Sequence, residues 1–175
     1  QVENGAAVDL LQEVYPQLTN LLQSMPVATA PGVEGDGRVG ALRRTVNGEL
    51  SGAFDDVQWQ IDPQAEALTR SLPPLVAEVL YSAAREGIRN AARHGRGDNS
   101  QYRLRLKIAL QTGEQGELRL MLEDNGVGLQ DRFARSVTEA GSADRPGSGQ
   151  GLALHSTLMA VIGGSLTLSS QPGQY

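Results

Sequence analysis

The chain has 175 residues, of which 39% are hydrophobic and only 4% aromatic, so we expect one domain of ordinary size with an aliphatic core. Its net charge of −5 argues against general nucleic-acid binding, which requires a basic surface. The lack of cysteine excludes disulfides and thiolate metal sites, two histidines leave little for a zinc site, and no apolar run approaches the roughly 20 residues that span a bilayer.

The N-terminal part of the chain predicts two helices separated by a linker. Residues 6–24 carry apolar side chains at a helical period. Residues 25–40 are rich in glycine, proline and alanine and predict a linker or a mobile loop, after which residues 39–54 return to helical spacing. The first residues do not resemble a signal peptide. Because the first residue is Gln1 rather than methionine, we expect the chain to be a fragment of a longer protein.

The middle of the chain predicts one strand and one long helix. Residues 57–62 alternate apolar and polar side chains, as a half-buried strand does. The helix is expected to begin after the pair Pro73-Pro74, since proline suits a first helical turn, and to end at Gly95 or Gly97.

The last third of the chain predicts two paired strands, a loop, a helix and another strand. Residues 102–110 and 118–124 alternate and are joined by a turn. Residues 130–150 are polar and rich in glycine and serine without a firm period, and a long loop of this kind is usually functional or mobile. A helix is expected over residues 151–162 and an alternating strand over residues 165–170.

The order of these elements determines the fold class that we predict. Alternating strands with one polar face imply a sheet that is covered by helices on one side only. We therefore predict an α+β fold, arranged as a two-layer α/β sandwich with the helices on one face of the sheet. Residues 1–36 are assigned to the N-terminal helix and linker and residues 37–175 to the folded domain, from which a closing strand expected after Tyr175 is missing.

The long helix carries a polar stripe near its C-terminal end. Glu86, Asn90 and His94 are spaced i, i+4 and i+8, so they share one edge of the helix, and the same stripe begins with the apolar residues Val79 and Ala83. Burying such polar groups without partners would cost roughly 1–3 kcal/mol each. Either the fold satisfies them or they line a cavity that holds a ligand.

Two interpretations of this stripe stay open. In the structural one, Glu86 pairs with Arg89 or Arg93 on the surface, and Arg93 and His94 complement the negative end of the helix. In the functional one, the carboxylate of Glu86 and the amide of Asn90 together hold a hydrated Mg²⁺, and Arg93 and His94 reach phosphate oxygens. The same stretch leaves open a local basic patch formed by Arg85, Arg89, Arg93 and Arg96.

A second motif, Asp124-Asn125-Gly126-Val127-Gly128-Leu129, follows the predicted strand over residues 118–124. Asn-Gly is a strong hairpin signal, but no alternating strand follows it, and the motif has too few carboxylates for a calcium loop. Alternatively, Asp124 points into a pocket at the end of the strand. An ionised carboxylate only accepts hydrogen bonds, so it suits an exocyclic amine such as that of adenine, and Gly126 and Gly128 would let the backbone approach a flat base.

A third motif, Gly147-Ser148-Gly149-Gln150-Gly151-Leu152, directly precedes a predicted helix. It is either a flexible loop before a helix start or a phosphate cradle, because exposed N–H groups and the helix dipole favour anions there. It is not a dinucleotide-binding fingerprint, since no strand precedes it, and it is not a P-loop, since it lacks the lysine.

In their order and spacing these motifs resemble those of the GHKL ATPase superfamily, which includes gyrase, Hsp90, sensor histidine kinases and MutL. Residues 85–95 are similar to the N box of bacterial sensor histidine kinases, residues 124–129 to their G1 box and residues 147–152 to their G2 box. Residues 163–173 also resemble that family, and the resemblance covers roughly residues 40–175.

The resemblance implies a Bergerat fold with a mixed sheet and an ATP- and Mg²⁺-binding catalytic domain. It implies that adenine binds at Asp124, that Asn90 is a ligand of Mg²⁺, that Glu86 holds or activates a water, and that residues 130–150 form the ATP lid. It implies further nucleotide contacts from Arg93, His94, Gly126, Gly128, Gly147, Gly149, Gly151 and Leu152.

The implied reaction is transfer of the ATP γ-phosphoryl group to a histidine on a helical dimerisation domain of the same protein. The predicted lid is short and resembles that of kinases whose partners are NarL-type response regulators. The resemblance further implies a homodimeric full-length protein in the cytoplasm, with an inner-membrane anchor left open and no nucleic-acid partner.

Residues 1–84 contain no histidine to accept a phosphoryl group, and Leu11 would occupy its place in the segment that faintly resembles an acceptor helix. His94 lies in the N box and His155 in the helix after the G2 box, so both are poor candidates for the phosphoryl acceptor. Residues 6–25 are then expected to be the truncated end of a dimerisation helix, and the fragment to bind nucleotide without phosphorylating itself. The alternatives are an anti-sigma-factor-type serine kinase, a GHKL module that binds nucleotide without catalysis, and a pure interaction module.

Overall fold

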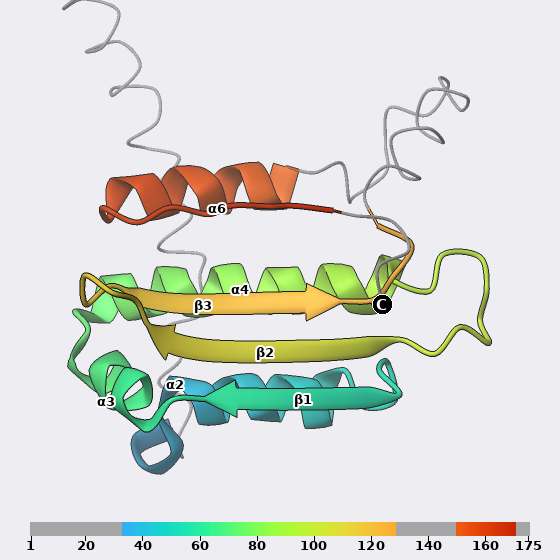
Figure 1. The fold of residues 1–175 in the computed structure, drawn as a ribbon, viewed down its shortest axis with the longest axis horizontal. Helices are drawn as coiled ribbons and strands as arrows, with labels where there is room; N and C mark the ends of the chain where they lie inside the picture. Colours follow the sequence, from blue (N-terminus) through green and yellow to red (C-terminus); the bar gives the residue numbers. More distant parts are fainter. Residues whose placement is uncertain (1–32, 129–149, 171–175) are drawn as a thin grey trace, which may run out of the picture. The chain divides into compact units, whose positions relative to one another are not determined.

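A computed structural model describes residues 33–128 and 150–170 of the chain (Figure 1). Internal contacts divide the chain into two units, Gln1–Glu34 and Gly35–Tyr175, and the fold below is that of the second unit. The helix predicted over residues 6–24 and nearly all of the predicted loop lie outside the described residues, so the assignment of an N-terminal domain stays a prediction.

The sheet contains strands β1 (Asp56–Ile61), β2 (Arg105–Thr112) and β3 (Leu118–Asp124) in the order β1-β2-β3. β1 pairs with β2 in parallel and β2 pairs with β3 antiparallel, so the predicted mixed sheet is confirmed. The register places Trp59 opposite Ile108 and Ile108 opposite Leu122. Partners across a ladder project from the same face, so these side chains form one apolar surface.

Helices cover that apolar surface. Figure 1 shows α2 (Val33–Arg44) and α4 (Pro74–His94) on one face of the sheet, which confirms the predicted two-layer α+β fold. The short π-helix η1 (Thr45–Glu49) follows α2, and α6 (Gln150–Val161) packs against α4. None of the described helices is long and apolar enough to cross a membrane.

The core lies between these helices and the sheet. Ile88 from α4 and Leu106 and Ile108 from β2 are almost completely buried. Burying a side chain of this size contributes roughly 1.5–3 kcal/mol. The cluster also contains Leu42, Val46 and Ala84.

The helix predicted over residues 39–54 is interrupted earlier than its pattern suggests. The α-helical part ends at Arg44, and the next turn widens, with Leu50 N–H donating to Thr45 O at 2.9 Å. Thr45 is β-branched and also donates its hydroxyl back to Ala41 O at 3.3 Å. Both features weaken a regular helix at this point.

Helix α3 (Pro63–Ser71) was not predicted, although the sequence contains its start signal. Asp62 caps the helix by accepting a hydrogen bond from Gln64 N–H at 2.9 Å, and Pro63 occupies the first helical position. An acidic N-cap followed by proline is a strong helix start.

Two of the strand predictions need correction. β2 begins at Arg105 rather than at residue 102, because Tyr102 O accepts from the Arg96 side chain and Leu104 N–H donates to the Asp55 side chain, outside the strand ladder. The strand predicted over residues 165–170 is wrong, since no ladder within the described residues includes it. Leu168 is 57% exposed, so the alternation there does not produce a buried face.

Candidate functional site

The three predicted motifs lie at one end of the domain as far as they are described. Figure 1 shows the C-terminal end of α4, the end of β3 and the N-terminal end of α6 at the same end of the sheet. Gly151 and Leu152 belong to the first turn of α6. Gly147 and Gly149 lie outside the described residues, so their proposed contacts stay predictions.

The end of α4 and the loop after β3 touch through two glycines. Val127 N–H donates to Gly95 O at 2.9 Å. A Cβ on Gly126 would lie 2.6 Å from Gly95 Cα and 2.7 Å from Asp124 Oδ1, so only glycine fits there. Gly126, which was predicted to give room for a base, therefore also gives room for the backbone that follows α4.

Asp124 ends β3 on the face that the helices cover. It is paired with Leu106 in the ladder and shares its face with Leu122, two residues earlier in the strand. The side chain is exposed, and Oδ1 accepts a hydrogen bond from Gly126 N–H at 2.9 Å. Among the described residues, nothing donates to the second carboxylate oxygen, Oδ2.

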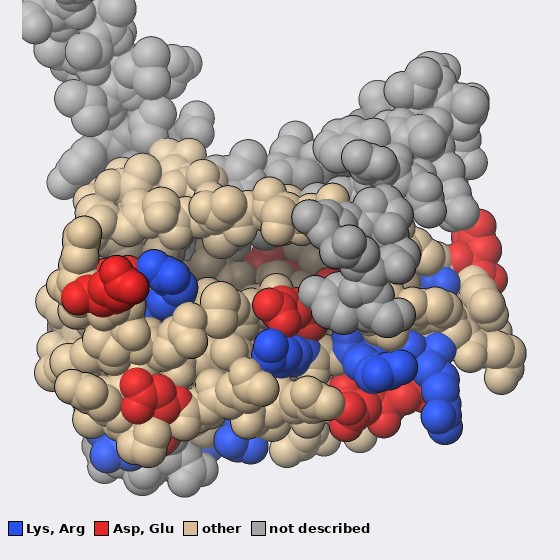
Figure 2. Space-filling model, in the orientation of Figure 1, with Lys and Arg blue, Asp and Glu red and all other residues tan. Residues whose placement is uncertain are grey.

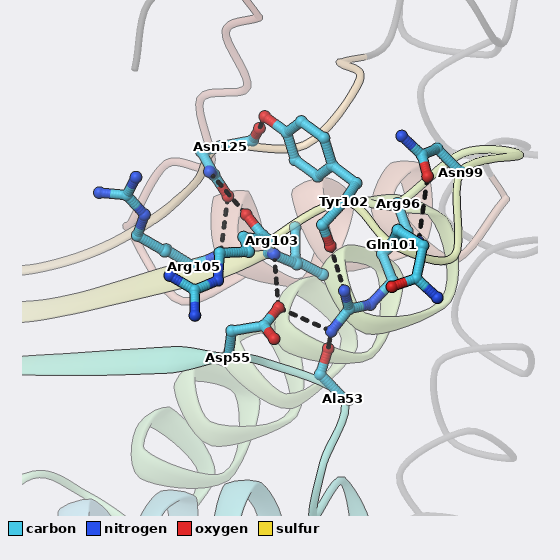
Figure 3. Close-up of polar contacts among 10 residues, drawn as sticks. Ala53, Asp55, Arg96, Asn99, Gln101, Tyr102, Arg103, Arg105 and Asn125 are labelled. Carbon is cyan, nitrogen blue, oxygen red and sulfur yellow. Dashed lines mark hydrogen bonds and ion pairs between the residues drawn. The ribbon is translucent and has the colours of Figure 1, made fainter.

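Asn125 fixes this loop to the start of β2. Arg105 N–H donates to Asn125 Oδ1 at 2.6 Å, and Asn125 Nδ2 donates to Arg103 O at 3.0 Å (Figure 3). The sequence predicted only a turn former at this position. The side-chain amide bonds to both a backbone donor and a backbone acceptor, so it joins two segments that are distant in sequence.

A second set of contacts ties the segment after α4 to the start of β1. Arg96 forms an ion pair with Asp55 at 2.9 Å and donates to Ala53 O at 3.2 Å (Figure 3). Asp55 also accepts from Leu104 N–H at 2.8 Å. The hydrogen bond from Leu104 and the neighbouring Arg96 guanidinium lower the pKa of Asp55.

Tyr102 connects these two sets. Its carbonyl oxygen accepts a hydrogen bond from Arg96, and its hydroxyl donates to the carbonyl oxygen of Asn125 (Figure 3). Neither Tyr102 nor Asp55 is part of a recognisable motif, so neither residue could be identified from the sequence.

Glu86 and Asn90 face each other one turn apart on α4. Asn90 Nδ2 donates to Glu86 Oε1 at 3.2 Å, and both side chains are half-buried. Glu86 Oε2 and the carboxamide oxygen of Asn90 have no hydrogen-bond partner among the described residues. No group of three or more histidine, cysteine or acidic side chains within the described residues is arranged to hold a metal ion by itself.

The structural interpretation of the polar stripe is wrong for Arg89. Arg85 and Arg89 both turn toward η1, where Arg85 forms an ion pair with Glu49 at 2.6 Å and Arg89 Nε donates to the same carboxylate at 2.9 Å. These two arginines lower the pKa of Glu49, and Glu49 raises the pKa of Arg85. Three of the four arginines of the possible basic patch form ion pairs: Arg85 and Arg89 share Glu49, and Arg96 pairs with Asp55.

Charges on the sheet face that the helices leave uncovered are of mixed sign. Figure 2 shows acidic and basic side chains next to one another there. Lys107 lies 3.2 Å from Glu123, and Arg119 lies 2.7 Å from Glu117. A separate cavity of about 390 Å³ is lined by residues of α2, η1, β1 and α3, and none of the three motifs contributes to it.

Comparisons with known proteins place the chain in a family of ATPases. The family model described as histidine kinase-, DNA gyrase B-, and HSP90-like ATPase matches residues 76–175. Sensor-type histidine kinase PrrB of Mycobacterium leprae (strain TN) is 28% identical over 158 residues, which cover 75% of this chain and 33% of the relative, so the chain spans about a third of that protein.

A similar solved structure is the histidine kinase domain from Erythrobacter litoralis EL346 blue-light activated histidine kinase. It superposes with a TM-score of 0.54 at 17% identity and covers 77% of this chain and 57% of that one. At this identity the likeness concerns the fold alone.

Proposed function

The chain belongs to the histidine kinase-, DNA gyrase B- and HSP90-like ATPase family, and we propose that it is the ATP-binding catalytic domain of a sensor histidine kinase. Its reaction would be transfer of the ATP γ-phosphoryl group to a histidine on a dimerisation domain of the parent protein. The observation that carries this proposal is the contact of Gly126 and Val127 with Gly95, which brings the Asp124 loop to the end of the helix that bears Glu86 and Asn90.

Asp124 would bind the adenine base. Gly126 N–H occupies one carboxylate oxygen and so orients the group, which leaves the second oxygen to accept from the exocyclic amine. The positive φ of Gly128, 78°, lets the backbone turn directly after this loop without strain.

Glu86 and Asn90 fit a hydrated Mg²⁺. Such an ion prefers oxygen ligands, keeps several waters and takes its remaining ligands from the phosphates of the substrate, so two side-chain oxygens on one helix flank are sufficient. Asn90 would be the direct ligand, and Glu86 would hold or activate a water. When bound, the ion would neutralise charge on the phosphoryl oxygens.

The phosphates would extend toward the N-terminal end of α6, because the backbone N–H groups of a first helical turn and the helix dipole favour anions. In this proposal Gly151 and Leu152 belong to that cradle together with Gly147 and Gly149, and residues 130–150 form the lid. Arg93 and His94, one turn beyond Asn90, would contact the phosphates from the side of α4.

Further parts of the proposal concern the parent protein. Residues 1–36 would be the end of its dimerisation domain, and the full-length protein would be a homodimer that passes the phosphoryl group to a NarL-type response regulator in the cytoplasm. The resemblance of the motifs to those of sensor histidine kinases supports these statements.

Nucleotide binding tests the core of the proposal. Calorimetry should show Mg²⁺-dependent binding of ADP, and Asp124→Asn should weaken it by about tenfold or more, because a hydrogen bond to a charged group is lost. Glu123→Gln is the matched control, since it makes the same change one residue earlier on the opposite face of β3. Equal affinity in wild type and Asp124→Asn would overturn the adenine assignment.

Phosphoryl transfer needs a separate experiment with the full parent protein and labelled ATP. Label that is lost in acid but kept in alkali would identify phosphohistidine, whereas acid-stable label would identify a serine kinase instead. The 175-residue chain alone should remain unlabelled.

A further inference from the structure

We propose that Tyr102 is a positioning residue for nucleotide selectivity, which holds the Asp124 loop in the orientation that discriminates between bases. The inference rests on the proposed function, because it concerns how the loop that would read the base is set. It assigns a role to a residue outside the three motifs.

The contact that motivates the proposal is made to the backbone of the loop itself. The Tyr102 hydroxyl donates to the carbonyl oxygen of Asn125, which stands between Asp124 and Gly126 (Figure 3). The same peptide unit leads to the N–H of Gly126, which donates to Asp124 Oδ1. Because a peptide unit is planar and rigid, holding its carbonyl oxygen also aims its N–H at the carboxylate.

Tyr102 is itself held in place by neighbouring residues. Arg96 donates to the Tyr102 carbonyl oxygen, and the Arg96 guanidinium is fixed by Asp55 and by Ala53 O. The Arg96 side chain is 25% exposed, and its bonds to the two backbone carbonyl oxygens are partly buried. A continuous chain of contacts therefore runs from the start of β1 through Arg96 and Tyr102 to the loop (Figure 3).

A second attachment makes the effect of losing Tyr102 graded rather than complete. The Asn125 side chain remains bound to the backbone of Arg103 and Arg105 whether or not the tyrosine hydroxyl is present. Removal of the hydroxyl would leave the loop in place but free its peptide unit to rotate. The aim of the Asp124 carboxylate would then loosen, and hydrogen-bond strength falls steeply with misalignment.

The test compares ADP with inosine diphosphate, which carries a carbonyl in place of the exocyclic amine. Tyr102→Phe removes only the hydroxyl, and in the 175-residue chain it should reduce the preference for ADP by about fivefold. Tyr81→Phe is the matched control, because the Tyr81 hydroxyl bonds to Thr45 Oγ1 at 3.3 Å on the other flank of α4. The control should keep the wild-type preference.

A second variant keeps the proposal testable if Tyr102→Phe does not fold. Asp55→Asn weakens the far end of the chain of contacts and should lower the ADP preference in the same direction by a smaller factor. Thermal unfolding would confirm that each variant is folded.

The outcomes distinguish a failure of the adenine assignment from a failure of the positioning role of Tyr102. Wild type that binds both nucleotides equally would overturn the adenine assignment under the proposed function. Wild type that prefers ADP, with an unchanged preference in Tyr102→Phe or, if that variant is unfolded, in Asp55→Asn, would overturn the positioning role alone.

Discussion

The two flanks of α4 differ in how they satisfy their polar side chains. On the flank toward η1, Arg85 and Arg89 share the carboxylate of Glu49, so these charged groups have partners within the protein. On the other flank, Glu86 and Asn90 bond to each other once and leave two oxygens without a described partner. These residues alternate within one short stretch of helix, so the sequence alone did not separate a structural flank from a ligand-binding one.

The largest effect is expected where the ligand-binding flank is held against the loop. In Gly126→Ala the new Cβ would meet the backbone of Gly95 at 2.6 Å, and backbone cannot move aside as a side chain can. We expect a loss of about 2 kcal/mol in the free energy of unfolding together with a clear loss of ADP affinity. Urea unfolding and calorimetry would measure both.

The matched control for this change is Gly48→Ala, because a Cβ at Gly48 meets nothing within 4 Å. It should leave ADP affinity unchanged. If Gly126→Ala is as stable as Gly48→Ala, the contact between the loop and the end of α4 is looser than described. That contact would then not distinguish the ligand-binding flank of α4 from the structural one.

A smaller effect, confined to binding, is expected from Asn90→Ala. Its amide bonds only to Glu86 among the described residues, so the free energy of unfolding should change by less than about 1 kcal/mol. The Mg²⁺-dependent part of ADP affinity should fall by about tenfold, because an oxygen ligand is lost. Calorimetry with and without Mg²⁺ would show this, with the exposed Asn47→Ala as control.

The opposite result is expected on the structural flank. Glu49→Gln leaves Arg85 and Arg89 without their anion, but the Glu49 side chain is 36% exposed, so solvent screening limits the loss of stability to about 1 kcal/mol. ADP affinity should stay within about twofold of wild type. A drop in Mg²⁺-dependent binding as large as that of Asn90→Ala would show that the two flanks are not independent. Glu114→Gln in an exposed turn is the control.

Most of the described fold could be predicted because apolar periodicity determines which faces are buried. The strand and helix periods placed β1, β3 and α4 closely and gave the two-layer arrangement. The same argument failed at residues 165–170, since alternation predicts a strand but not whether a neighbouring strand pairs with it.

The sequence predicted the motif residues of the candidate site but not the residues that hold those motifs in place. Glu86, Asn90 and Asp124 stood out because polar residues at inward positions and glycine-rich turns have a chemical meaning. Asp55, Tyr102 and Glu49 act through contacts with residues more than 20 positions away in the chain, and no local pattern reports such a contact.

The smallest expected effect is a difference in pH dependence that only the structural flank should show. Hydrogen bonds from Arg85 and then from Arg89 lower the pKa of Glu49 below its ordinary value of 4.5. A carboxyl whose pKa is lower in the folded state stabilises the fold above its unfolded pKa, and this contribution disappears as the pH falls through the folded pKa. The stability difference between wild type and Glu49→Gln, at most about 1 kcal/mol at pH 7, should therefore shrink below pH 4.5.

Asp55 and Glu117 also have lowered pKa values and titrate in both proteins, so only the difference between the two urea-unfolding curves isolates Glu49. A difference that stays constant down to acid pH would mean that the glutamine substitution acts through packing, and that the pairing of charges is not what distinguishes this flank of α4.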